Sequence, residues 1–351
     1  MTAAAASVAA GVADNVRRTH NASDGMYEVW YLTWNHAATN TGYWLRYTLE
    51  YPSASSAGEH AAPHAEVWFA RFDRNNPSRN FGVHRRFAGA SVNSSIAPFS
   101  LNIAASRLTN ESATGSVAGA GHAVSWRLAW QPNASTYRQL PDVMYARGGI
   151  GETTVLSPNV RALVDGELFV DGQRIELQQA VLGQTHVWGQ KHAHSWAWGR
   201  CAEFAEAPGA WLEALSVRLI RGGVTLPPLT LVSLNIDGGV LQFNQFRHTA
   251  LNRSSWSTGH YEMTAVGAAA KLRCVLSAAP QHFITAPYRD PDGTAVFCAN
   301  TEVGDAHLTL WRRAGLGWGN PRELTSTGRA HFETGGGGAD AAVPKTHILL
   351  T

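Results

Sequence analysis

The chain has 351 residues, of which 15% are charged and 44% hydrophobic, and its formal net charge is +2 at pH 7. This balance indicates a globular chain with a substantial core and excludes a disordered protein. No basic patch or block of like charge occurs, so nucleic acid is not expected as a partner. The length allows one large β domain or two medium ones.

The three cysteines are odd in number and lack the spacing of a metal site. We therefore expect no disulfide framework, a reducing cytoplasmic compartment, and thiols that behave as small buried hydrophobic groups. Residues 1–24 are Ala-rich and lack the parts of a signal peptide, which predicts a loose tail or a short helix. No apolar run approaches about 18 residues, so no transmembrane segment is predicted.

Period-two alternation dominates the first half of the chain. The stretch "YEVWYLTW" places Glu28, Trp30 and Trp34 on one face of a strand and Tyr27 and Tyr31 on the other. "GYWLRYTLEY" follows a polar turn in the same style, so the two strands predict a hairpin. "HAEVWFARFDR" and "GHAVSWRLAWQP" are further strands, and "GELFVDGQRIEL" predicts a hairpin around its Asp-Gly turn.

The second half repeats the pattern in segments such as "AWLEALSVRLI", "LTLVSLNI" and "AHLTLWRR". Helical patterns of 12 residues or more are scarce, and many short strands at regular spacing are typical of a sandwich or a barrel. The fold class is therefore all-β. We expect two β domains packed together, at residues 25–180 and 181–351, with "KTHILL" as the last strand after a Gly-rich loop.

Thirteen tryptophans are the unusual feature of the composition, and "THVWGQKHAHSWAWGRCAEF" holds three of them with three histidines. Tryptophan can simply fill a wide β core, or it can line a pocket for an apolar ligand. A buried acid among aromatic faces is the pattern needed to protonate an alkene and to stabilise the resulting cation. The stretch therefore predicts a pocket lined by Trp188, Trp196 and Trp198.

Three residues are candidates for the acid or for a proton relay: His186, Glu28 and His194. His186 shares a face with Trp188, although a hydrogen-bonded histidine at a strand end is the commoner situation. Glu28 shares a face with Trp30 and Trp34, where a carboxylate is unusual unless it is functional or paired, for example with Arg46. His192 is expected at a solvated turn.

Further side chains are candidates for binding the substrate. Trp30, Trp34 and Trp68 lie on the strands of the first half, and Asn35 stands at a strand end where a barrel mouth would be. Arg200 shares a face with Trp196 and Trp198, and it is either a stacked structural cation or an anchor for a substrate oxygen. His186, His192 and His194 lack an evident third partner for a metal ion, so no metal site is predicted.

Several stretches together resemble the tocopherol cyclase-like family. They are the Glu-x-Trp-Tyr signature in "YEVWYL", the Gly-rich turn and Trp strand in "GSVAGAGHAVSWRLAWQP", the strand "HSWAWGRCAEF", and the closing segment "APYRDPDGTAVFCANTEVGDAHLTLWRR". "HVWG" followed by "WAWGR" is also similar to carotenoid 1,2-hydratases and related lipocalin-like pericyclases. The resemblance covers most of residues 25–313 and implies that the two domains are lipocalin-like β-barrels or sandwiches.

The resemblance implies a cyclase, isomerase or hydratase that uses no redox cofactor. Such proteins hold a prenyl, polyene or other lipophilic small molecule, and an acid in the pocket starts the reaction. This chain departs from the hydratase pattern, because the residues immediately before "HVWG" are Gly-Gln-Thr, with no acidic residue, and Glu213 is the only carboxylate on the next strand. The alternative is a non-catalytic carrier of a lipid or pigment. The sequence leaves open whether the pocket lies within one domain or between the two, and it does not give the oligomeric state.

Overall fold

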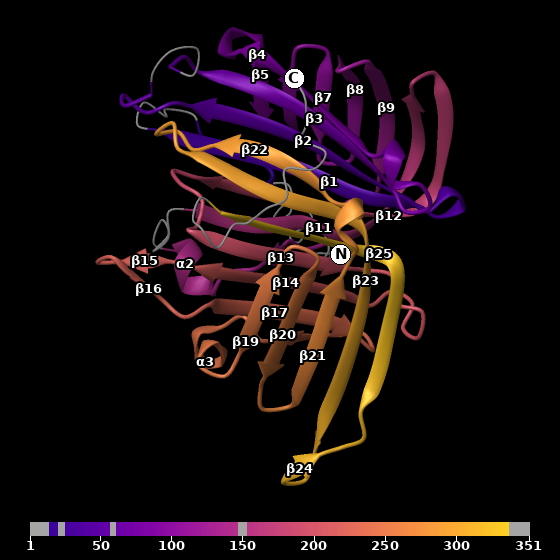
Figure 1. Ribbon diagram of the computed structural model, residues 1–351, viewed down its shortest axis with the longest axis vertical. Coiled ribbons are helices and arrows are strands. Elements are labelled where there is room, and N and C mark those ends of the chain that lie inside the picture. Colours follow the sequence, from indigo (N-terminus) through magenta and orange to yellow (C-terminus); the bar gives the residue numbers. More distant parts are fainter. Residues whose placement is uncertain (1–13, 20–24, 57–60, 147–152, 337–351) are drawn as a thin grey trace.

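The computed structural model describes residues 14–19, 25–56, 61–146 and 153–336. The predicted all-β class is confirmed, and the strands form two large sheets (Figure 1). Most of the predicted tail at residues 1–24 and the predicted strand "KTHILL" lie outside the described residues. Within the described ranges, no helix has the length and apolar character needed to cross a membrane.

The N-terminal sheet has twelve strands in the order β4-β3-β2-β1-β12-β11-β9-β8-β7-β6-β5, with β10 paired to β11, and it curls into a nearly closed barrel. Both predicted hairpins are present, and the turn of the second one has positive φ values at Asp171 and Gly172. The strands are β1 (Met26–His36), β2 (Thr41–Tyr51), β3 (His64–Asp73), β4 (Phe81–Ala88), β5 (Val92–Ile96), β6 (Phe99–Ile103), β7 (Ser106–Thr109), β8 (Ser112–Gly119), β9 (His122–Trp130), β10 (Tyr137–Arg138), β11 (Thr153–Val170) and β12 (Gln173–Gly189).

The C-terminal sheet has eleven strands in the order β18-β17-β14-β13-β25-β23-β21-β20-β19, with β22 and β24 paired to β23. The strands are β13 (Ser195–Cys201), β14 (Trp211–Arg218), β17 (Leu229–Ile236), β18 (Gly239–Gln242), β19 (Arg253–Ser257), β20 (His260–Val266), β21 (Ala270–Ser277), β22 (Ile284–Arg289), β23 (Ala295–Ala314), β24 (Gly317–Trp318) and β25 (Arg322–Gly336). The minor elements are the pair β15 (Ile220–Arg221) and β16 (Val224–Thr225), the helices α2 (Asp142–Ala146) and α3 (Phe246–Thr249), and the 3₁₀ turns η1 (Ala37–Thr39), η3 (Pro77–Arg79), η4 (Gly89–Ser91) and η5 (Pro280–His282).

Each sheet encloses a hydrophobic core of its own. The N-terminal core contains Trp30, Trp34, Tyr43 and Phe69, which are fully buried inside the barrel. The C-terminal core includes all of the apolar side chains that alternate with the tryptophans of β13, such as Ala197. The period-two alternation of the strands therefore sends one set of residues to each core and the other set outward.

The outward faces of the two sheets pack against each other and form a third apolar cluster. Trp44 and Trp68 of the N-terminal sheet meet Trp196, Tyr288 and Cys298 of the C-terminal sheet in this cluster. In Figure 1 the two sheets are stacked along the long axis of the molecule, with β22 and part of β23 reaching beside β1 to β3. The predicted close packing of two β domains is therefore seen in the structure.

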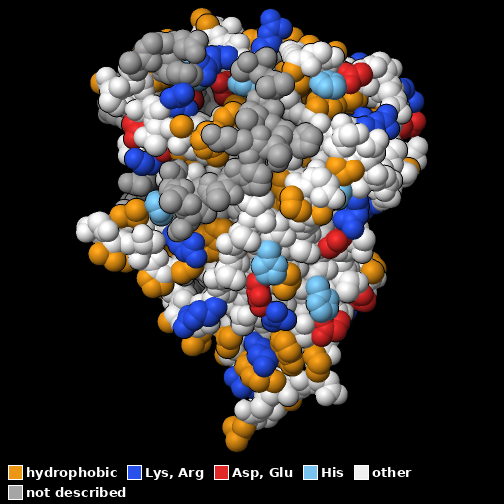
Figure 2. Space-filling view, in the orientation of Figure 1, with side chains coloured by type: hydrophobic (Ala, Val, Ile, Leu, Met, Phe, Trp, Pro, Cys, Tyr) orange, Lys and Arg blue, Asp and Glu red, His pale blue; other side chains and the backbone are white. Residues whose placement is uncertain are grey.

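The chain crosses from one sheet to the other between Gly189 and Ser195. The expected division between residues 180 and 181 lies inside β12, which pairs with β1 and β11 along most of its length. On the face shown in Figure 2, basic and acidic side chains are interspersed over both sheets.

Candidate functional site

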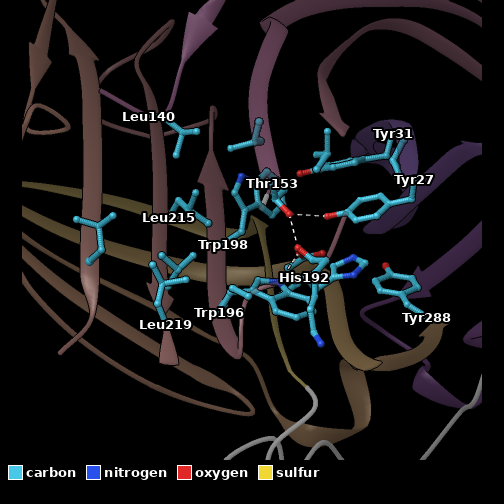
Figure 3. Close-up of a pocket in the computed structure, with 18 of the residues that line it drawn as sticks. Tyr27, Tyr31, Leu140, Thr153, His192, Trp196, Trp198, Leu215, Leu219 and Tyr288 are labelled. Carbon is cyan, nitrogen blue, oxygen red and sulfur yellow. Dashed lines mark hydrogen bonds between the residues drawn. The ribbon is translucent and has the colours of Figure 1, made fainter. Parts of the chain in front are cut away.

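A pocket of about 170 Å³ lies between the two sheets, on the outward faces of β1, β2, β13 and β14 (Figure 3). Its lining is mostly apolar and aromatic, as is usual for small-molecule sites. The residues that line it are Tyr27, Val29, Tyr31, Trp44, Arg46, Leu140, Met144, Thr153, Val155, Val187, Lys191, His192, Ala193, Trp196, Trp198, Leu215, Val217, Leu219, Leu229, Tyr288 and Glu333.

The two ends of this pocket differ in chemistry. Figure 3 shows aliphatic side chains at one end, among them Leu140, Leu215 and Leu219. The opposite end is aromatic, with Tyr27 and Tyr288 in the same view. One end of the pocket is therefore aliphatic, and the other end combines aromatic rings with polar groups.

His192 stands at the aromatic end of the pocket and is held there on several sides. Its ring is stacked on Tyr27, with 4.6 Å between the centroids and an interplanar angle of 1°, and it also stacks on Trp196 and Tyr288. Asp290 accepts a hydrogen bond from Nδ1 at 2.6 Å and another from the His192 backbone N–H at 3.0 Å. The expectation of a solvated turn was wrong for this side chain, because Asp290 lies 98 residues away and the sequence spacing does not reveal it.

Glu333 is the carboxyl group that lines the pocket. It lies on β25 directly opposite Trp198 in the register with β13, and Trp196 Nε1 donates a hydrogen bond to Oε1 at 2.8 Å. Burial raises the pKa of Glu333, and this outweighs the opposing effects of the Trp196 hydrogen bond and the Arg46 charge. The aromatic pocket thus contains a carboxyl group whose environment favours the protonated form.

Trp196 and Trp198 both lie in the pocket wall, on the face of β13 that the alternation predicted. Trp198 meets the ring of Tyr31 edge-on, with 5.6 Å between the centroids. The Trp196 indole packs directly against the backbone of Gly335, because a Cβ added at this position would lie 2.3 Å from the ring. Two of the predicted aromatic residues therefore remain candidates for contact with a ligand.

A second group of buried polar residues lies outside the pocket lining. Glu213 accepts a hydrogen bond from Trp198 Nε1 at 3.1 Å, and its other oxygen lies 3.8 Å from Arg200 Nε. Burial raises the pKa of Glu213 to about 7 despite the Arg200 charge. Arg200 also donates to the Val160 carbonyl at 3.1 Å, so its guanidinium bridges the two sheets rather than facing the pocket.

Asn35 joins the same polar group through His331 and Glu302. Its Nδ2 donates to the Glu302 carbonyl at 2.7 Å, and its Oδ1 lies 2.6 Å from His331 Nε2. Glu302 Oε2 lies 3.1 Å from His331 Nδ1. Burial raises the pKa of Glu302 well above its usual value and lowers that of His331 well below, so both side chains favour their neutral forms.

Glu28 and His186 form a pair on the other face of β1 and β12. Glu28 Oε1 lies 2.8 Å from His186 Nε2, and neither side chain is exposed. The backbone N–H groups of Arg18 and Thr19 and the Thr19 hydroxyl also donate to Glu28, while His186 Nδ1 lies 2.7 Å from the Asp14 carbonyl. Burial opposes ionisation of Glu28, but these hydrogen bonds and the imidazole lower its pKa overall.

The Glu28–His186 pair therefore ties residues 14–19 to the barrel and is not part of the pocket lining. The salt bridge considered between Glu28 and Arg46 is not formed, because the two side chains lie on opposite faces of the N-terminal sheet. His194, the third candidate for an acid, is half-buried beside β13 and does not line the pocket either.

The other predicted aromatic residues are distributed over three places. Trp30 and Trp34 are buried in the N-terminal core. Trp68 belongs to the cluster between the sheets and donates to Glu66 at 3.1 Å. Trp188 stacks beneath Arg18, whose Cζ lies 5.4 Å from the ring centroid. No group of three or more His, Cys, Asp or Glu side chains in the described ranges is arranged to hold a metal ion.

Comparisons with known proteins agree with this architecture. The sequence profile of the tocopherol cyclase-like family matches residues 24–336. An Oryza sativa subsp. japonica protein named probable tocopherol cyclase, chloroplastic, is 26% identical over 182 residues, which are 50% of this chain and 38% of the rice protein. The chloroplastic tocopherol cyclase of Zea mays is 27% identical over 181 residues, which are 50% of this chain and 37% of the maize protein. The matched segments thus span well under half of either plant protein.

Two solved structures share the fold over most of the chain. An AttH-type protein of Nitrosomonas europaea has a TM-score of 0.53 at 11% identity, with 93% of this chain and 96% of that chain covered. CghA in complex with Sch210972 has a TM-score of 0.51 at 10% identity, with 90% and 89% covered. The resemblance seen in the sequence is confirmed by the profile match over residues 24–336, and the chain belongs to the tocopherol cyclase-like family.

Proposed function

We propose that this protein is a cyclase, isomerase or hydratase that acts on a lipophilic small molecule in the pocket between the two sheets. The observation that carries the proposal is Glu333, a carboxyl group with a raised pKa that faces an aromatic pocket. Family membership supports the same class of function. CghA, which shares this fold, has been solved with Sch210972.

The chemistry follows from the residues at the aromatic end. Protonated Glu333 donates its proton to a carbon–carbon double bond of the substrate, and the Trp196 and Trp198 rings stabilise the positive charge that develops. A hydroxyl of the substrate then attacks the cation in a cyclisation, or a water molecule attacks in a hydration. In either case the oxygen loses a proton, which returns to the Glu333 carboxylate. The pocket walls hold the substrate in the folded conformation that the ring closure needs.

A carrier protein would use the same pocket without any chemistry at Glu333. The first experiment is native mass spectrometry of the protein purified from its own host, with organic extraction of any bound compound. The extracted compound, or its precursor with the corresponding open chain or double bond, is then incubated with the wild type and with Glu333→Gln.

We expect the Glu333→Gln variant to keep its ligand affinity and to lose turnover by about 10²-fold or more. His194→Ala is the control, since His194 lies between the pocket residues His192 and Trp196 in the sequence but does not line the pocket, and its turnover should stay within about twofold of the wild type. Conversion that is equal in the wild type and in Glu333→Gln would exclude Glu333 as the acid. Binding without any conversion in the wild type would favour the carrier.

A further inference from the structure

Arg46 is a buried cation that the proposed reaction does not use. It lies on the outward face of β2 and is only 6% exposed. Its guanidinium carbon lies 4.0 Å from the ring centroid of Tyr288, and 5.7 Å and 5.9 Å from those of Trp68 and Trp44. Its Nε donates to the Thr48 hydroxyl at 2.9 Å. The aromatic rings and this hydrogen bond position the side chain.

Among the described residues, no carboxylate lies within ion-pair distance of Arg46. The two acidic side chains on its side of the sheet already have other partners: Glu66 pairs with Arg86 at 3.1 Å, and Glu50 lies 3.3 Å from His64 Nε2. Glu333 lines the same pocket and is affected by the Arg46 charge, but it forms no ion pair with Arg46, and burial raises its pKa and favours its neutral form. A buried guanidinium without a counter-charge is costly, because aromatic faces replace only part of its hydration. The position of Arg46 therefore indicates that its negative partner is supplied from outside the chain.

Arg46 stands where two pockets meet. A second pocket of about 680 Å³ adjoins the first and shares with it Tyr27, Arg46, His192 and Tyr288. Figure 3 shows Tyr27, His192 and Tyr288 together at the aromatic end of the first pocket. The lining of the second pocket is more polar than that of the first, and in addition to Arg46 it includes Arg85, Arg86 and Arg289 together with Glu50 and Glu66.

We propose that the ligand of the apolar pocket carries an acidic head group, a carboxylate or a phosphate, that binds the guanidinium of Arg46. The hydrocarbon part would extend to the aliphatic end near Leu215 and Leu229, and the head group would lie at the junction with the second pocket. A planar guanidinium offers two parallel N–H groups to such an oxyanion. This inference rests on the pocket of the proposed function and adds the charge of its ligand.

The experiment compares three probes with the same hydrocarbon chain: decanoate, decyl phosphate and decanol. Each is titrated into the full-length protein at pH 8, and binding is followed by isothermal titration calorimetry. We expect at least one anion to bind about tenfold tighter than decanol. A preference for decanoate or for decyl phosphate would show which acidic group the site accepts.

Three variants test whether the preference for anionic probes depends on Arg46. In Arg46→Gln the affinities for both anions should fall to within about twofold of the affinity for decanol, and the affinity for decanol should not change. Arg46→Lys should keep part of the preference for anions because it keeps the positive charge. Arg127→Gln is the control: its side chain is 81% exposed on β9, and the variant should behave as the wild type. Arg46→Lys also serves as the informative variant if Arg46→Gln does not fold.

Two outcomes would overturn the inference. One is equal affinity for all three probes in the wild type, and the other is an anion preference that survives in Arg46→Gln. Decanol binding without any anion preference would contradict the acidic head group and leave the apolar pocket intact. If none of the three probes bound, both the head group and the proposed lipophilic pocket would be contradicted.

Discussion

Buried glutamates on the inner face of the N-terminal sheet and on the C-terminal strands between the two sheets have opposite protonation environments. Glu28, on the inner face, receives hydrogen bonds from three groups of residues 18–19 and lies against His186, and its pKa is lowered. Glu213 and Glu302, between the sheets, are equally inaccessible but have few donors, and their pKa values are raised. Burial alone therefore does not set the charge of a glutamate. The number of donors that the fold brings to the carboxylate decides it.

The largest effect that this comparison predicts concerns the Glu28–His186 pair. Glu28→Gln should lower the free energy of unfolding by about 3–5 kcal/mol, because a buried carboxylate with several hydrogen-bond donors is lost and the donors are left without their acceptor. Urea unfolding followed by circular dichroism measures the change. Glu176→Gln, which breaks an exposed pair with Arg174, should cost less than about 1 kcal/mol. A similarly small loss for Glu28→Gln would show that the pair contributes little to stability.

The sign of the pH dependence of stability also distinguishes the glutamates between the sheets from Glu28. The pKa of Glu213 is about 7 in the folded protein and 4.5 as the ordinary value, so the folded state keeps a proton that the unfolded state has released. Between these values stability falls as the pH rises, by on the order of 3 kcal/mol in total. His331, whose pKa is lowered, contributes the opposite slope below its ordinary value of 6.5.

The contribution of Glu213 to the pH dependence of stability is therefore measured as the difference between the wild type and Glu213→Gln. Unfolding free energies of the wild type and Glu213→Gln are compared at several pH values from 4.5 to 8, and the variant should gain stability relative to the wild type as the pH rises. For Glu28 the sign is reversed: its stabilisation is present above about pH 4.5 and is lost as the pH falls through its lowered folded pKa. Parallel curves for the wild type and Glu213→Gln would contradict the raised pKa.

A smaller effect is expected at Gly42, where β2 of the N-terminal sheet lies against β23 of the C-terminal sheet. A Cβ on Gly42 of β2 would lie 2.4 Å from the Glu302 backbone oxygen on β23, so Gly42→Ala would force the sheets apart. We expect this variant to lose about 1–3 kcal/mol of unfolding free energy in urea. Gly239→Ala is the matched control, since nothing lies within 4 Å of the added Cβ. Equal stability of both variants would show that the interface tolerates a wider spacing.

The last prediction concerns the pH profile of turnover. Since the protonated form of Glu333 donates the proton, kcat should be constant at low pH and should fall about tenfold per pH unit above the raised pKa of this group. The profile is measured with the compound identified by mass spectrometry. A rate that rises with pH would require a base in place of an acid at this position.

Much of the fold could be predicted from the sequence, because alternation and turn residues are local signals. The division of β1 into two faces and the shared face of Trp196 and Trp198 both agree with the structure. The choice of the functional face could not be made from one strand. Trp30 and Trp34 carry the larger side chains, and they fill the barrel, whereas the face with Tyr27 lines the pocket.

The residues that sequence reasoning missed depend on contacts between distant strands. His192 is positioned by Asp290, and Glu333 enters the site only through the pairing of β25 with β13. A local signal for Glu333 existed in the alternation of "RAHFET", where Phe332 faces the core and His331 and Glu333 face the other sheet. That signal does not reveal which strand lies opposite.

The pocket lies on the outward faces of strands whose inward faces build the two cores. This arrangement affects how the ligand preference of the protein can change during evolution. In β14, Leu212 and Ala214 belong to the C-terminal core, while Leu215 and Val217 line the pocket. Stability and ligand choice are thus assigned to different positions of the same strands. New ligand preferences can arise by substitution at the lining positions of one sheet, while both cores and the opposite wall keep their residues.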